Sequence, residues 1–264
     1  MKKFFVIAWV FALAFAMLAP SSLTASAASP GFENHVLKPS KDTEKVFEKV
    51  TLNKDGDMYR MSVKGYIKKG DHKAEGYHIH IDPKKMTYKA TKISDEKVKK
   101  EEPTSDVSTP LTPLLSKTYS PLSVVSPMST RVTYAKIKAV TDDPVGADLV
   151  WTIHQLTWNY DGTYAYKGAT EGSCHYASPS TFGTYWYNDS CYYDNYSTID
   201  GGRTVTVTAH GSYHNYDFGD NSLITKVTHK INIEGYGSGS AYYWVDWTRS
   251  GEHANYLDLD VYKY

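Results

Sequence analysis

The stretch RTVTVTAHG at residues 203–211 decides the fold. Its apolar residues Val205, Val207 and Ala209 alternate with polar ones, and this period of two is typical of a β-strand with one buried face. Residues 131–264 therefore predict about eight or nine short strands in an antiparallel β-sandwich or jelly roll, with a barrel as the alternative. Similar alternation recurs at 131–140, 149–160, 223–233, 241–248 and 256–262.

Aromatic residues are concentrated in the same region, which holds 18 of the 23 Tyr and 5 of the 6 Trp. In YYWVDW, residues 242–247, alternate side chains point to opposite faces, so one set is expected in the core and one outside. Exposed rings with polar neighbours suit sugar faces and protein partners. Alternatively, the rings only fill the core and the pleated surface, since aromatic residues favour strands. The predicted ligand-binding residues are Trp186, Tyr187, Tyr242, Trp244 and Trp247.

The N-terminus has the three parts of a secretory signal peptide. Residues 1–3 are cationic, residues 4–18 are apolar, and Ala-Ser-Ala at 25–27 marks a cleavage site before Ala28. The apolar stretch is shorter than the roughly 20 residues of a transmembrane helix, so a membrane anchor is the weaker alternative. Residues 1–27 thus predict a secreted, extracellular protein with no transmembrane anchor after cleavage.

A charged region follows at residues 28–102, which contain no Trp or Cys. We expect a short helix over 40–50 and strands over 58–67, 77–81 and 86–93, which together make a small α+β region. Its low apolar content suggests a pro-segment that assists folding or a small accessory domain.

Residues 103–130 separate this region from the aromatic-rich β domain at 131–264. Of these 28 residues, 17 are Ser, Thr or Pro. Proline fixes φ and removes backbone donors, so the composition predicts a disordered linker that is also a plausible site of proteolytic release.

The two halves of the chain carry opposite charge. Residues 131–264 contain 9 Lys or Arg and 15 Asp or Glu, a net charge of −6, and residues 1–130 carry +6. Nucleic acid demands a basic face, so the β domain is not expected to bind it. The opposite charges would attract the two halves, unless each merely belongs to a solvated surface.

The chain has two cysteines, Cys174 and Cys191. One Cys pair in an exported chain predicts a disulfide bond, with two free thiols as the alternative. Closing a loop of this length stabilises the folded state by about 3 kcal/mol.

Two sets of polar residues are candidate metal ligands on the N-terminal and C-terminal strands. His78, His80 and Asp82 alternate and so share one face, but a surface strand explains them equally well. Asp258 and Asp260 alternate on the last predicted strand, where we expect a solvated outer face.

A third set lies near the middle of the β domain. His210 and His214 share one strand face, and Asp217, Asp220 and Asn221 follow in a turn. Oxygen ligands in a loop suit Ca²⁺, although Asp and Asn also favour turns for backbone reasons. Ca²⁺ is the one cofactor that these residues suggest.

Catalytic motifs are sparse. The sequence has neither Gly-x-Ser-x-Gly nor His-Glu-x-x-His, and His154 is expected to be a packed residue. The Tyr- and Trp-rich strands resemble in composition those of small jelly-roll xylanases, but no catalytic residue is matched. Glycoside hydrolysis needs two carboxyl groups, and the domain offers Glu171, Glu234 and Glu252.

These observations favour a secreted, non-catalytic β protein that binds glycan or a cell-surface polymer through exposed Tyr and Trp. One alternative is a small glycosidase-like secreted hydrolase with a pro-segment. The other is a surface-interaction or toxin-like protein that residues 28–130 hold inactive.

Overall fold

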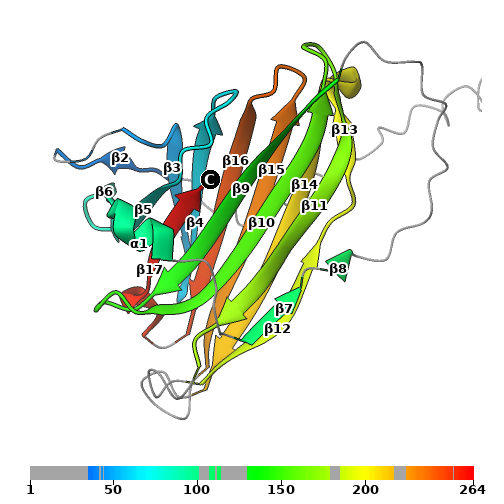
Figure 1. The fold of residues 1–264 in the computed structure, drawn as a ribbon. Helices are drawn as coiled ribbons and strands as arrows, with labels where there is room; N and C mark the ends of the chain where they lie inside the picture. Colours follow the sequence, from blue (N-terminus) through cyan, green and yellow to red (C-terminus); the bar gives the residue numbers. More distant parts are fainter. Residues whose placement is uncertain are drawn as a thin grey trace, which may run out of the picture. The chain divides into compact units, whose positions relative to one another are not determined.

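The fold was analysed in a computed structural model of the chain, which is mostly β (Figure 1). The strands form two sheets, here called sheet A and sheet B, so the prediction of a mostly β chain is confirmed. The structure describes residues 35–41, 43, 45–100, 107–110, 112–113, 130–178, 185–216, 224–251 and 253–264. The predicted signal peptide lies outside these residues.

Sheet A combines strands from both halves of the chain. All its neighbours are antiparallel except β12 and β8, and β13 (Ser197–Ile199) pairs with β14 beside this path. In order across the sheet, the strands are β1 (His35–Val36), β3 (Lys49–Asp55), β4 (Met58–Ile67), β16 (Ala241–Ser250), β15 (Thr225–Tyr236), β14 (Thr204–Asn215), β12 (Trp186–Tyr193) and β8 (Thr112–Pro113).

Sheet B is built in the same way, and only β2 and β6 run parallel. Short helical segments are α1 (Asp95–Lys100), η1 (Asp200–Gly202) and η2 (Ala254–Tyr256). In order across the sheet, the strands are β2 (Lys38–Pro39), β6 (Thr87–Lys92), β5 (Glu75–Asp82), β17 (Asp258–Lys263), β9 (Arg131–Asp142), β10 (Asp148–Tyr160), β11 (Ala165–Tyr176) and β7 (Val107–Pro110).

A single large hydrophobic core lies between the two sheets. Ile79, Leu156 and Trp158 contribute to it from sheet B, and Val207 and Ile231 from sheet A. Inward residues recur with period two along most of the strands, because successive side chains of a strand point to opposite faces, and the period breaks at irregularities such as that between Asn188 and Ser190 of β12. Burying this apolar area supplies the main favourable free energy of folding.

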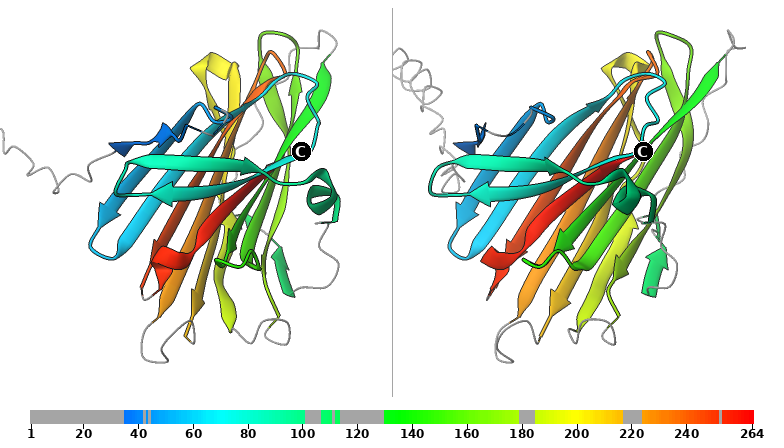
Figure 2. Two further views of the ribbon diagram at one scale, coloured as in Figure 1. Left: turned by 90° about the vertical axis from the view of Figure 1, so that its left-hand side faces the viewer. Right: turned by 60° about the vertical axis from the view of Figure 1, so that its left-hand side comes forward.

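The N-terminal region is part of both sheets. β4 pairs with β16 from Tyr59 opposite Arg249 to Ile67 opposite Ala241, and β5 pairs with β17 from Glu75 opposite Lys263 to Ile79 opposite Leu259. The hairpin β3–β4 thereby extends sheet A, and β5–β6 extends sheet B (Figure 2). The sequence predicts a pro-segment or a small accessory domain at 28–102; in the structure, described residues of this region and of 131–264 contribute to one core. Its removal as a pro-segment stays a prediction.

The helix expected over residues 40–50 is wrong for the residues that the structure describes there. β3 begins at Lys49, and Phe47 and Val50 are buried in the common core. Pairing with β4 and burial of alternate side chains outweigh the local helical pattern. The one described α-helix is α1, whose N-terminal turn carries Asp95 and Glu96.

Part of the predicted linker is paired with the sheets rather than free. The backbone of β7 pairs with β11 in sheet B, and that of β8 pairs with β12 in sheet A. The rest of 103–129 lies outside the described residues. At the same end of the two sheets, the predicted disulfide between Cys174 of β11 and Cys191 of β12 is confirmed and links sheet B to sheet A.

A chain of buried hydrogen bonds also links the sheets. Trp247 Nε1 donates to Thr141 Oγ1 at 2.8 Å, and Thr141 Oγ1 lies 2.8 Å from His229 Nε2. His229 Nδ1 lies 3.1 Å from Thr152 Oγ1, which lies 2.8 Å from the Tyr213 hydroxyl. That hydroxyl donates to a backbone carbonyl of β10 at 2.7 Å. With the His229 proton on Nδ1, every hydroxyl both donates and accepts, so the polar groups are satisfied without water.

The burial of His229 makes the stability of the fold sensitive to acid. Burial lowers the pKa of His229 to about 3, whereas an unfolded histidine titrates near 6.5. The unfolded chain therefore binds the additional proton first, and stability falls as pH drops from about 6.5 toward 3, by about 1.4 kcal/mol per pH unit from this residue.

We predict that H229Q has a shallower loss of unfolding free energy than the unmodified chain between about pH 6 and 4. Urea unfolding across this range measures the slope. H80Q, in which an exposed histidine is replaced, should retain the original slope. An H229Q slope equal to that of the unmodified chain would contradict a neutral His229 in the core.

A second prediction concerns residues 28–102. A chain of residues 103–264 should aggregate or lose cooperative thermal unfolding, because β16 and β17 become open edges and inward side chains such as Val245 and Leu259 lose their cover. Size-exclusion chromatography and thermal unfolding test this, with the chain beginning at Ala28 as control. A monomeric 103–264 fragment that melts like the control would instead support a separate accessory domain.

Candidate functional site

The outer side of sheet A carries a mixed aromatic and polar surface, here called the sheet A face. Strand register places its side chains in rows, because outward residues of paired strands lie opposite one another. The core side holds the alternate residues, such as Ile231 and Val245. The rows are Tyr66–Tyr242–Glu234, Lys64–Trp244–Asn232 and Ser62–Asp246–Lys230–His210–Tyr192.

Rings on this face are held by their neighbours. The centroids of Tyr66 and Tyr242 are 4.8 Å apart, and Tyr236 meets Tyr242 edge-on at 5.7 Å. Lys64 Nζ lies 4.2 Å from the Tyr242 ring centroid and 5.3 Å from that of Trp244. Cation–π contact and ring packing restrict these side chains before any ligand arrives.

Two hollows indent the sheet A face, and residues of β4 line both of them. The first, of about 250 Å³, includes Arg60, Asp246 and the stacked pair Tyr192 and His210, whose centroids are 4.6 Å apart. The second, of about 390 Å³, is lined by Val36, Lys49, Thr51, Ser62, Lys64 and Trp244. Both combine ring surface with hydrogen-bonding side chains, as ligand sites do.

The predicted ligand-binding residues divide between surface and core. Tyr242 and Trp244 lie on the sheet A face, and Tyr187 is exposed on β12, stacked on His214. Trp186 and Trp247 are 1% exposed, so neither reaches a ligand at the surface. The alternation in residues 242–247 assigns the side chains to two faces correctly. The pattern of one sequence does not show which of these faces points into the core.

Of the carboxylates considered for hydrolysis, the two that the structure describes do not come together. Glu171 is exposed on β11 of sheet B, and Glu234 lies on the sheet A face, where it accepts a hydrogen bond from Tyr236 at 2.9 Å. Glu252 lies outside the described residues. A two-carboxylate mechanism needs both groups beside one bond, so Glu171 and Glu234 cannot serve as that pair. His154 is fully buried, which confirms a packed residue.

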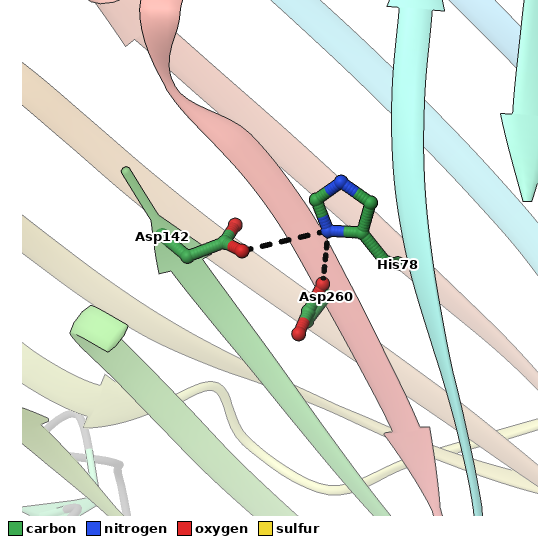
Figure 3. A group of neighbouring side chains, drawn as sticks. All are labelled: His78, Asp142 and Asp260. Carbon is green, nitrogen blue, oxygen red and sulfur yellow. Dashed lines mark hydrogen bonds and ion pairs between the residues drawn. The ribbon is translucent and has the colours of Figure 1, made fainter. Parts of the chain in front are cut away.

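A second candidate site lies on the outer side of sheet B, where His78 of β5 meets two aspartates (Figure 3). His78 Nδ1 is 2.8 Å from Asp260 Oδ1 and 3.4 Å from Asp142 Oδ2. The three residues lie on the neighbouring strands β5, β17 and β9, with His78 directly opposite Asp260. They are here called the His–Asp–Asp cluster.

The cluster differs from the metal ligands that the sequence suggests. His78 and His80 do share the outer face, and His80 contacts Asp258 at 3.1 Å. Asp82 instead accepts hydrogen bonds from two backbone N–H groups in the turn after β5. The expectation of a solvated Asp260 is wrong, since its side chain is buried.

Electrostatic contacts shape the titration of this cluster. Contacts with Asp142 and Asp260 raise the pKa of His78 to about 10. Burial, together with the nearby carboxylates, raises the pKa of Asp142. In the absence of another cation, a protonated His78 balances part of the buried negative charge.

The helix α1 shields one side of this cluster. Val98 packs with Val140, Trp151 and Tyr262 in a small second core on the outer side of sheet B. This packing places Lys97 Nζ 3.8 Å from Asp260 Oδ2. No local motif reveals the cluster, because His78 and Asp260 are 182 residues apart in sequence.

The turn proposed for Ca²⁺, with Asp217, Asp220 and Asn221, lies outside the described residues. His210 and His214, which precede it, do point to the outer side of sheet A. Among the described segments, no helix has the length and hydrophobicity needed to cross a membrane.

Comparison with known proteins gives no relative: no family model matches the chain, and neither the curated proteins nor the solved structures yield a significant match.

Proposed function

We propose that the two sheets form a β-sandwich that works outside the cell and binds glycan or another cell-surface polymer along the sheet A face. The observation that carries this proposal is the pair of hollows on the sheet A face, one lined by Trp244 and the other by Tyr192 and His210. The signal-peptide pattern and the disulfide bond support an extracellular setting.

The chemistry of the face suits a hydroxyl-rich chain. The rings of Tyr242 and Trp244 offer apolar surface to the C–H face of a sugar. Asp246 and Arg60, which line one of the hollows, supply acceptors and donors for hydroxyl groups on the same face. Because Lys64 and Tyr66 already restrain the rings, binding costs little side-chain entropy.

An elongated ligand is favoured over a small molecule. The two hollows lie on adjacent strands and are open to solvent, whereas a small-molecule site buries most of its ligand. A polymer would cross β4, β16 and β15 and gain weak contacts at several rows at once. Hydrolysis has less support, because Glu171 and Glu234 lie on opposite sheets.

We predict that W244A weakens binding to insoluble polysaccharide or cell-wall sacculi by about tenfold or more, because a central ring is lost. Depletion of protein from solution measures the affinity, and released sugars are assayed in the same tubes. Y256A is the matched control, since Tyr256 is an exposed ring in η2, outside both hollows.

Loss of binding in W244A with normal binding in Y256A would support the sheet A face. Equal binding by the unmodified chain, W244A and an additional D246N variant would contradict it. Sugar release by the unmodified chain would support hydrolysis instead of binding alone.

A further inference from the structure

We propose that the His–Asp–Asp cluster is a binding site for one divalent transition-metal cation of the Zn²⁺ class. This inference is independent of the proposed glycan binding, since the cluster is on sheet B and the sheet A face is on the other sheet.

The geometry brings three ligand atoms together. His78 Nδ1, one oxygen of Asp142 and one of Asp260 all lie within 4.8 Å of one another. Zn²⁺ binds His nitrogen and carboxylate oxygen at about 2.0–2.2 Å, so ligand atoms of a tetrahedral site are about 3.3 Å apart. The Nδ1 to Asp142 distance of 3.4 Å already matches, and the 2.8 Å to Asp260 needs only a small outward shift.

The burial of the aspartates favours the binding of a cation. Asp142 and Asp260 are each 1% exposed. Asp142 Oδ1 is buried and has no hydrogen-bond partner among the described residues, and its carboxylate projects toward the His78 ring (Figure 3). A buried carboxylate oxygen without a partner is costly, and a metal ion bound by both Asp142 oxygens, Oδ1 as well as Oδ2, would remove that cost.

Charge favours a divalent ion over a proton. Asp258 Oδ2 lies 3.8 Å from His78 Nε2, so carboxylates approach both nitrogens of one imidazole. A proton on His78 brings one positive charge to the cluster, whereas a metal ion on neutral His78 brings two. Lys97 contributes a further positive charge beside Asp260.

Outer partners orient two of the three ligands. Tyr262 donates a hydrogen bond to Asp260 Oδ2 at 3.2 Å, which leaves Oδ1 directed at His78. With a metal on Nδ1, the Nε2–H of His78 would face Asp258, the arrangement in which a carboxylate fixes the ring of a metal-bound histidine.

The donor set also indicates which ion fits. One imidazole and two carboxylates suit Zn²⁺ and its neighbours in the first transition row, whereas Ca²⁺ prefers an all-oxygen shell of six to eight ligands. The His78 side chain is 35% exposed, so solvent reaches the cluster and water can fill the remaining coordination position.

The test is a Zn²⁺ titration of the full chain, purified without a polyhistidine tag and treated with chelator. Isothermal calorimetry gives stoichiometry and affinity, and the visible spectrum with Co²⁺ reports the ligand geometry. We expect one Zn²⁺ per chain, and at least about tenfold weaker binding in H78Q and in D142N. H80Q is the matched control, because His80 is on the same strand face and outside the cluster.

H78Q should fold, because His78 is partly exposed, and circular dichroism checks each variant. Folded H78Q that binds Zn²⁺ as well as the unmodified chain would overturn the proposal. Failure of the unmodified chain to bind Zn²⁺ in a defined ratio would overturn it too. Loss of binding in H80Q but not in H78Q would assign the metal to Asp258 and His80 instead.

Discussion

The pairing of β4 with β16 and of β5 with β17 is the constraint on which the rest of the structure depends. These ladders join residues near the two ends of the described chain and complete both sheets. Both candidate sites lie across them: Lys64 stands opposite Trp244, and His78 stands opposite Asp260. Each site therefore needs a partner from each half of the chain, and neither half alone contains a complete one.

Hydrogen bonds inside the core also fix how the two sheets are aligned. The hydrogen-bond chain through His229 admits few alternative packings, because a shifted sheet would leave buried donors without acceptors. The disulfide bond between β11 and β12 closes the far end of the two sheets. The buried hydrogen bonds and the disulfide bond thus fix the positions of the two sheets. The outer faces that carry the proposed glycan and metal sites are fixed with them.

Local pattern was enough to predict most strands but not their partners. The period of two around Val207 correctly predicts an inward face, and the disulfide follows from cysteine count and compartment. Burial of Asp260 and of Trp186 could not be predicted, because it depends on strands distant in sequence. The failed helix at 40–50 has the same origin: pairing with β4 overrides a local preference.

Hydrogen exchange followed residue by residue on the intact chain tests the shared-sheet account most directly. If both halves form one cooperative unit, the central amides of β4 and β5 should open with nearly the same free energy as those of β14 and β15, since all belong to the same two sheets. Exchange of β4 and β5 at a distinctly lower free energy, while β14 and β15 stay protected, would show that residues 28–102 unfold separately and would contradict the account.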